Sequence, residues 1–436
     1  MSATIVPFGP RLHTPIGHVI RTGEMSHRQY EYLHAEGRLP AKHVIVDASR
    51  ARFQKEFIRA LRDDGADVIL DTKAAELSEV GRFRGMAKSA PWAATEEDRP
   101  LNPGDFQLSA NTDLFGQMAR MAVELGITAV MAPTHFLRNG ANDPWLPIDG
   151  AGVMRLRSAL DREGGAAIAI DYPLILPHTR LQDRTDRARL IQALDGLPFD
   201  NLILRLSGFG SNAMPGTVKG TFIAIEALHG LGRPVLLDHV GGLVGLSALA
   251  FGIVSGIAHG IGEREQFSAR DWHKHPKERE KGASFGRPIY VPLFGLDKTF
   301  RVKDLKAIAS APGGRRLISC PDRECCPRGL ESMLQNPRAH IARQQFAMID
   351  HLGSVPDTRR IGHFFDVDLR GAERTARDLA RLNTGNEKLS GALVAGRNRI
   401  DRMAGMYETL AERERGTPLP MRRRNASGAA SGHGAP

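Results

Sequence analysis

The chain has 436 residues, 42% hydrophobic and 25% charged, so it can bury a core of barrel size. Its three cysteines exclude a disulfide framework and favour a reducing cytoplasm. The formal net charge of +10 favours a polyanionic partner, although part of that charge lies in the tail at residues 421–424.

Two features bear on location. The first residues, MSATIVPFGPRLH, lack the basic start and apolar run of a signal peptide, so we expect a cytoplasmic protein. Residues 240–258 carry no charge and approach the ~20-residue length of a membrane span. That stretch is dense in glycine, however, and Asp238 and His239 border it. We therefore expect no membrane partner.

Short apolar runs alternate with helical periodicity along most of the chain. The runs are continuous rather than alternating, which is typical of strands buried on both faces. Eight are predicted as strands: 67–70, 128–131, 167–170, 202–206, 235–237, 255–258, 289–291 and 316–319. Eight β/α units over about 250 residues predict a (β/α)8 TIM barrel. An open doubly wound sheet is the alternative, but no glycine fingerprint follows the first strand.

This pattern predicts four regions. They are an N-terminal extension (1–62), the barrel (63–328), a Cys/His-linked helical region (329–415) and a disordered basic tail (416–436). Within the extension, residues 44–46 could form a strand. A charged insertion at 263–287 should lie on the active face of the barrel, where it could grip a phosphate backbone.

Polar residues that follow barrel strands point into the active site. Three acids stand directly after predicted strands, and we expect them to be catalytic: Asp71, Asp171 and Asp238. A carboxylate there costs desolvation energy unless it is paired or used, and its pKa is open to tuning. The alternative is that one or two of them pair with arginine in the barrel mouth.

Further strand ends supply candidate substrate-binding residues. They are Ser207, Gly208, Gly241, Gly242, Leu243 and His259. Glycines such as Gly241 and Gly242 allow a ligand to approach the backbone closely, or allow tight packing of helix on strand. The sequence leaves both roles open.

All three cysteines lie within seven residues, at Cys320, Cys325 and Cys326, and His340 follows about one helix later. Thiolate and imidazole are preferred zinc ligands, and structural sites take four of them. We therefore predict a Zn²⁺ site of three cysteines and one histidine. His351 is the reserve fourth ligand, and plain buried or surface thiols are the alternative.

Together these residues resemble the tRNA-guanine transglycosylase family, including its relatives that insert 7-deazaguanine bases into DNA. Asp71-Thr72 is similar to the family's base-contacting D-S-G-G-F turn, without the glycines. The stretch 241–245, GGLVG, looks like the family's GGLAVGE, and 206–210 only loosely echoes its G-I-V-Q-G-G turn. The cysteines run C-x4-C-C rather than C-x-C-x-x-C. The resemblance covers about residues 71–351.

The resemblance implies base exchange on a nucleic acid, tRNA or DNA, with a deazaguanine-type base as the small substrate. An aspartate would attack the anomeric carbon, the base would leave, and a replacement base would attack the covalent intermediate. Asp238 and Asp297 are both possible nucleophiles. The substrate base would be extruded into the barrel mouth. A homodimer is possible, and the sequence does not decide the oligomeric state.

Two other functions remain open. A metal-dependent hydrolase of the amidohydrolase type would use His239, His259 and Asp322 as ligands to activate a water. The first predicted strand lacks the His-x-His pair that such enzymes carry. A catalytically inert barrel that binds nucleic acid would show the same basic surface without needing the three acids.

Overall fold

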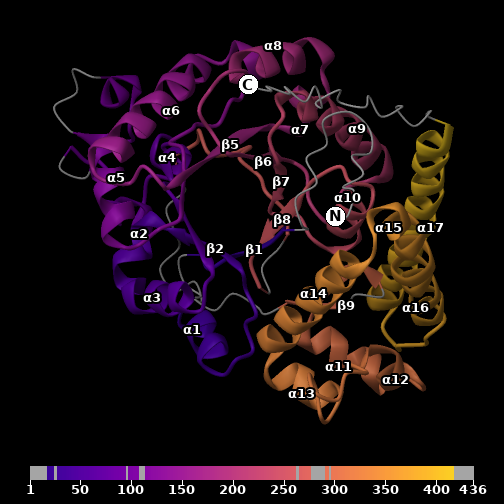
Figure 1. Ribbon diagram of the computed structural model, residues 1–436. Coiled ribbons are helices and arrows are strands. Elements are labelled where there is room, and N and C mark those ends of the chain that lie inside the picture. The colour runs from indigo at the N-terminus through magenta and orange to yellow at the C-terminus, as the bar shows by residue number, and fades with distance from the viewer. Residues whose placement is uncertain are drawn as a thin grey trace, which may run out of the picture.

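The computed structural model describes residues 17–23, 27–94, 97–107, 113–261, 265–275, 290–293 and 296–416. Eight parallel strands form a closed barrel with helices around it, as the expected (β/α)8 TIM-barrel fold requires (Figure 1). The basic tail from residue 417 onward and most of the charged insertion lie outside the described residues.

The barrel strands follow one another in chain order. They are β1 (Gly17–Arg21), β2 (His43–Asp47), β3 (Asp67–Asp71), β4 (Ala129–Met131), β5 (Ala169–Pro177), β6 (Asn201–Ser207), β7 (Val235–Asp238) and β8 (Gly256–His259). The barrel closes where β8 pairs with β1, with Gly256 opposite Gly17 and His259 opposite Ile20.

The helices of the barrel half lie outside this ring. They are α1 (His27–Ala35), α2 (Ala48–Ala51), α3 (Lys55–Asp63), α4 (Ala74–Leu77), α5 (Leu114–Glu124), α6 (Trp145–Arg162), α7 (His178–Gln182), α8 (Arg184–Leu194), α9 (Pro215–Glu226) and α10 (Gly242–Ala250). Short 3-10 turns supplement them, such as η3 (Pro103–Phe106) before α5.

Two of the eight runs predicted as barrel strands do not belong to the barrel. Residues 289–291 fall at β9 (Tyr290–Leu293), which pairs with β10 (Lys298–Arg301) in a separate two-stranded sheet. Residues 316–319 fall largely in helix α12 (Gly314–Ile318). The first two barrel strands are instead β1 and β2, which lie in the segment expected to be an N-terminal extension.

The physical reason lies in β1 itself. Its sequence is GHVIR, and only two of the five residues, Val19 and Ile20, are strongly apolar. Arg21 is polar and yet buried, because it faces other charges inside the barrel. Periodicity alone therefore cannot find β1. Conversely, a four-residue apolar run such as 316–319 does not distinguish strand from helix.

The barrel has an apolar layer inside and a larger core outside. The inner layer contains Val19, Ile45, Ile69, Ala129, Met131, Ile203 and Ala258. Side chains alternate along a strand, so neighbouring residues such as Ile20 and Val44 face the helices and join the outer core. This alternation decides which residues face the interior near the carboxyl ends of the strands.

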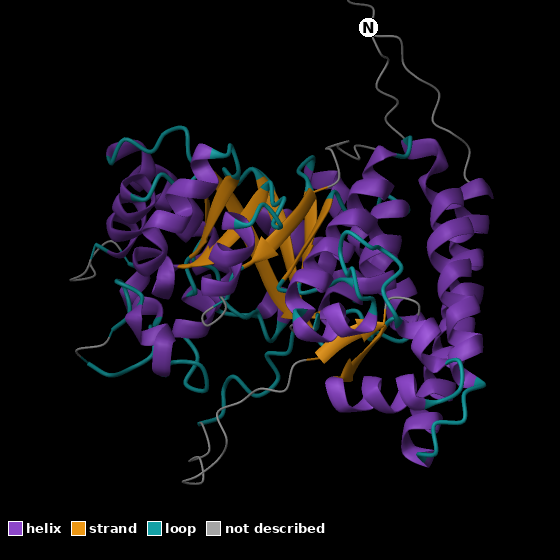
Figure 2. Ribbon diagram, turned by 90° about the horizontal axis from the view of Figure 1, so that it is seen from below, coloured by secondary structure: helices purple, strands orange, loops and turns teal. Residues whose placement is uncertain are grey.

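The chain leaves the barrel after β8 and forms a helical region beside it (Figure 2). Its helices are α11 (Val302–Ser310), α12, α13 (Leu330–Gln335), α14 (Pro337–Ser354), α15 (Asp357–His363), α16 (Arg370–Ala380) and α17 (Glu387–Gly416). Ser247 Oγ of α10 donates a hydrogen bond to the hydroxyl of the buried Tyr407 of α17 at 2.8 Å. Among the described residues, no helix has the length and hydropathy needed to cross a membrane.

Replacing Tyr407 by phenylalanine should lower the free energy of unfolding by about 1 kcal/mol, because the change removes a buried hydrogen bond between α17 and α10 and leaves the ring in place. Urea denaturation measures this. The matched control is Tyr32→Phe in α1, where the side chain is largely exposed. Equal stability of the two variants would show that the contact contributes nothing.

Candidate functional site

Five charged side chains converge inside the barrel near the carboxyl ends of its strands. Each of them comes two residues after a residue that belongs to the inner apolar layer or packs against that layer. Side chains alternate along a strand, so each of the five also faces the interior. They are Arg21, Asp47, Asp71, Arg205 and Asp238, and all five are buried. We call these five residues the mouth ring.

The two arginines and two of the aspartates form a closed set of charged hydrogen bonds. Arg21 donates from Nε and Nη2 to the two oxygens of Asp238, both at 2.7 Å, and from Nη1 to Asp71 Oδ2 at 2.9 Å. Arg205 bridges the same two carboxylates, with Nε to Asp238 Oδ2 and Nη2 to Asp71 Oδ2, both at 2.9 Å. Bidentate arginine–carboxylate contacts of this kind are strong and directional.

The carboxyl groups of the ring differ in pKa. Burial alone would raise the pKa of Asp71 and Asp238, but the guanidinium groups of Arg21 and Arg205 outweigh it and hold both pKa values below the ordinary range. For Asp47 burial prevails and raises the pKa to about 6, against Lys73 and Arg21, which lower it. Asp47 Oδ1 lies 3.8 Å from Arg21 Nη1 and from Lys73 Nζ, too far for hydrogen bonds.

The loop after β3 extends the network. Lys73 adopts a left-handed backbone with φ of 57°, and its ammonium donates to Glu76 Oε1 at 2.6 Å. Its backbone N–H donates to Asp71 Oδ1 at 3.0 Å. Glu76 also lies 3.7 Å from Arg205. The backbone of Lys73 thus holds Asp71 in place, and Lys73 and Glu76 add two buried charges beside the ring.

His239 directly follows β7, next to Asp238 of the mouth ring, and has a strained backbone. Its φ of 62° is in the left-handed region, which is uncommon for residues other than glycine and often marks functional positions. Its imidazole stacks on Phe267, with ring centroids 5.5 Å apart. Burial is the main cause that lowers the pKa of His239 to about 4, so the ring is neutral at pH 7.

The predicted catalytic acids do not all meet. Asp71 and Asp238 share the mouth ring, whereas Asp171 lies toward the other end of the barrel. Asp171 accepts a hydrogen bond from Asn201, the first residue of β6, at 2.7 Å. The pKa of Asp171 is raised to about 7, mainly by burial and in smaller part by Asp200 and Asp67 at the amino ends of strands, against the hydrogen bond from Asn201, which lowers it.

The predicted substrate-binding residues of β6 and the β7–α10 turn lie at the carboxyl rim, but protein groups contact them. Ser207 Oγ accepts from Ala269 N at 2.9 Å, and Gly208 N donates to Phe267 O at 3.0 Å. Leu243 N, in the first turn of α10, donates to Asp297 Oδ1 at 2.9 Å.

The two glycines before Leu243 leave space for carboxylates of the same chain. A Cβ at Gly241 would lie 2.3 Å from the Glu265 carboxylate, and one at Gly242, which has φ of +57°, would lie 2.1 Å from Asp297. In this structure these glycines thus admit carboxylates of the chain itself close to the backbone.

His259 does not belong to the mouth. It ends β8 but faces outward, where its Nε2 lies 3.1 Å from Nε2 of the equally buried His18. Burial lowers the pKa of both imidazoles. His18 in turn packs against Phe346 of α14. The predicted substrate role of His259 would require a ligand on the helical side of the barrel wall.

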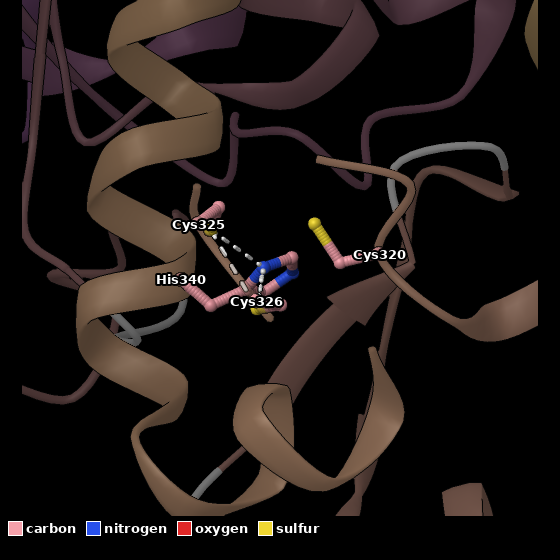
Figure 3. Close-up of side chains that lie close together, drawn as sticks. All are labelled: Cys320, Cys325, Cys326 and His340. Atoms are coloured by element: carbon pink, nitrogen blue, oxygen red, sulfur yellow. Dashed lines mark hydrogen bonds between the residues drawn. The ribbon is translucent and has the colours of Figure 1, made fainter. Parts of the chain in front are cut away.

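The three cysteines and His340 come together in one buried cluster (Figure 3). Their ligand atoms all lie within 4.8 Å of one another. His340 Nδ1 is 3.5 Å from the sulfurs of both Cys325 and Cys326, and these two sulfurs are 3.6 Å apart. Tetrahedral Zn²⁺ with bonds of about 2.3 Å to sulfur and 2.0 Å to nitrogen needs spacings of about 3.7 and 3.5 Å. The residues therefore fit a four-coordinate metal ion.

The loop of the metal centre is preorganised by Asp322. Its Oδ1 accepts from the backbone N–H groups of Glu324 and Cys325 at 2.9 and 3.0 Å. Its Oδ2 accepts from Arg343 of α14 at 2.9 Å. Asp322 thus closes the turn that presents the two adjacent cysteines from one side.

The hydrolase alternative requires His239, His259 and Asp322 to meet, and they do not. His239 contacts the mouth, His259 faces the helices, and Asp322 belongs to the cysteine loop. Within the described residues, the group of histidine, cysteine and acidic side chains arranged to hold a metal is the one at Cys320.

Sequence reasoning missed Arg21, Asp47 and Arg205. Arg205 carried a detectable signal, because an arginine inside the apolar run NLILRLS must be paired if that run is a barrel strand. Asp47 ends the run HVIVD, which was considered only as a possible strand. Arg21 carried no comparable signal.

No family model matches this chain, and no curated protein matches it. Solved structures match at the level of the chain trace. One is a protein of Coccidioides immitis described as a deoxyribose-phosphate aldolase, which is 11% identical, covers 59% of this chain and 84% of its own, and has a TM-score of 0.35. A likeness this distant carries no functional weight, and the barrel mouth must be interpreted from its own geometry.

The purified protein should contain about one zinc per chain. The Cys325→Ser variant should lose the metal, because a closed tetrahedral site loses affinity when one of its four protein ligands is removed. Elemental analysis of the two proteins measures this. His351→Ala is the matched control and should keep its metal, since His351 contacts His363 rather than the cluster. Metal that survives Cys325→Ser would place the site elsewhere.

Asp47→Asn should change the pH dependence of stability. Burial raises the pKa of Asp47 from 3.8 to about 6, so the folded chain holds this proton more tightly than the unfolded chain. Ionised Asp47 therefore costs the native state about 3 kcal/mol above about pH 6, a cost absent below about pH 4. The free energy of unfolding of Asp47→Asn minus that of wild type should rise by about that amount between these pH values.

Urea denaturation at each pH measures this difference. Asp63→Asn, at an exposed position of α3, is the control and should give a flat difference. The same flat difference for Asp47→Asn would contradict a raised pKa at this position.

Proposed function

We propose that this chain is an enzyme that exchanges a guanine-type base in tRNA or DNA at the carboxyl-end mouth of its barrel. One observation carries the proposal. Neighbouring carboxyl groups there have opposite protonation tendencies, with Asp238 and Asp71 held ionised and Asp47 able to bind a proton near neutral pH. Enzymes that use one carboxylate as nucleophile and another as acid or base are built this way.

The nucleophile is Asp238. Of the two candidates, Asp297 has a structural position, because it accepts from Leu243 N at the start of α10 and pairs with Arg399 at 2.8 Å. Asp238 lies in the mouth ring at the end of β7 and is ionised between two guanidinium groups. Asp71 shares both arginines, and its similarity to the family's base-contacting aspartate suits it to orient the base.

The reaction needs two displacements. An oxygen of Asp238 donates an electron pair to the anomeric carbon, the glycosidic C–N bond breaks, and the departing base takes up a proton from Asp47. The incoming base then attacks the glycosyl ester, gives a proton to Asp47, and Asp238 leaves as a carboxylate. No oxidant or further reactant is required, and the ring returns to its starting protonation.

The environment of Asp238 favours exchange in both directions. A carboxylate stabilised by Arg21 and Arg205 is a weak base, which makes it a good leaving group in the second displacement. The same stabilisation makes it a poorer attacking group, and correct placement by the ring compensates. Such a balance suits a reaction whose two half-steps are chemically alike.

The remaining features support a nucleic-acid substrate. The formal net charge of +10 favours binding to phosphates. A base inside a duplex or folded RNA must be extruded to reach a buried ring. The metal centre, with four protein ligands, leaves no open coordination position and supports the segment that follows the barrel rather than the chemistry.

The test is incorporation of radiolabelled guanine or a 7-deazaguanine base into tRNA and into DNA by the purified protein. Asp238→Asn should abolish incorporation, and Asp47→Asn should reduce it by about a hundredfold or more, because each removes one step of the proton or electron-pair movement. Asp171→Asn is the matched control and should stay within a few-fold of wild type, since Asp171 lies toward the other end of the barrel.

Loss of activity in Asp171→Asn together with full activity in Asp47→Asn would contradict this assignment of roles. Nucleic-acid binding without incorporation by any form of the protein would favour the inert binding barrel. Circular dichroism of each variant shows whether the barrel is intact.

A further inference from the structure

The mouth ring is sealed in this structure. Asp238, Arg205 and Asp71 have exposed fractions of only 1%, 2% and 3%. The anomeric carbon of a substrate cannot reach Asp238 unless a segment of the chain moves. The question is which segment covers the ring.

The cover is residues 265–275, which we call the strap. Exposed and buried residues alternate along it, with Phe267 and Ala269 pointing inward and Gln266, Ser268 and Arg270 pointing outward. Its inward side chains form a separate apolar cluster. The members of that cluster are Ala75, Phe136, Ile175, Phe267, Ala269 and Trp272.

Phe267 lies directly on the charged site. The Arg205 guanidinium carbon is 6.0 Å from the centre of its ring, and the His239 imidazole stacks on it at 5.5 Å with an interplanar angle of 23°. Guanidinium and neutral imidazole both favour contact with a flat π-system. A benzyl ring makes no hydrogen bonds, so Phe267 contacts Arg205 and His239 through the face of its ring alone.

The strap is held by few main-chain contacts. It contains turns, bends and one isolated bridge, between Gln266 and Gly210, rather than a helix or a strand. Its hydrogen bonds to the rest of the barrel include Ser211 N to Glu265 O, Gly208 N to Phe267 O, Ala269 N to Ser207 Oγ and Gly81 N to Trp272 O, at 2.7–3.0 Å. Segments of this kind open locally more easily than barrel strands do.

We propose that Phe267 occupies the seat of a planar heteroaromatic ring, and that the strap is a lid which such a ligand displaces from Arg205 and His239. The ligand class is a purine-type base, whose N–H groups can donate to the carboxylates of the ring while its face stacks where Phe267 now lies. This inference rests on the proposed function, because it describes how the base would enter the proposed site.

The first test uses guanosine 5′-monophosphate as the probe and calorimetric titration as the measurement. Phe267→Ala should bind it about tenfold or more tightly than wild type, because the ligand no longer competes with the benzyl ring. Phe136→Ala is the matched control. It removes the same ring from the same apolar cluster at a position that contacts Trp272 rather than Arg205, and should gain much less.

Unchanged or weaker binding by Phe267→Ala, or an equal gain in both variants, would overturn the seat assignment. Ribose 5-phosphate should show no difference among the three proteins, because it lacks a planar ring. A difference of the same size with ribose 5-phosphate would also overturn the assignment.

The second test needs no substitution. Hydrogen–deuterium exchange of the wild-type chain should become faster in the strap and at Gly81, Gly208 and Ser211 when guanosine 5′-monophosphate is added, since their amide bonds to the strap are lost together. Unchanged or slower exchange there would show that the strap does not leave. Opening of the strap without base incorporation would reject the proposed function alone, and incorporation without opening would reject this inference alone.

Discussion

The structure depends on four charges that are buried together. Arg21 and Arg205 bridge Asp71 and Asp238 through hydrogen bonds of 2.7–2.9 Å inside a closed barrel. Any one of these groups alone in that place would carry a large desolvation cost, and deleting one partner of a buried pair typically costs about 3–5 kcal/mol. The network therefore fixes the positions of four strands relative to one another at the mouth: β1, β3, β6 and β7.

The same network prepares chemistry. It keeps Asp238 and Asp71 ionised and leaves Asp47, one strand away, with a raised pKa. Burial and the ionised carboxylates of Asp71 and Glu76 favour the protonated form of Asp47, whereas Lys73 and Arg21 favour its ionised form. The stable arrangement of charge and the arrangement that could transfer a base are thus one structure.

The Cys/His cluster and the strap are linked through α14. This helix carries His340 of the Cys/His cluster, and five residues later Gln345 donates from Nε2 to Glu265 Oε1 at 2.7 Å, at the first residue of the strap. Phe346 packs on His18 of β1. A metal ion that orders the cysteine loop would therefore also fix the helix that anchors the strap and lines the barrel wall.

The sequence by itself determined the barrel class and the cluster of cysteines and histidine that could hold a metal ion. Continuous apolar runs mark strands such as β6, and three cysteines within seven residues need little tertiary information to be recognised as one cluster. Only the tertiary structure decided that β1 and β2 open the barrel, that Asp171 lies away from Asp238, and that Arg21, Asp47 and Arg205 complete the site. The reason is physical: hydrophobic periodicity reports burial against apolar neighbours, whereas these charged residues are buried against one another from strands up to 217 residues apart.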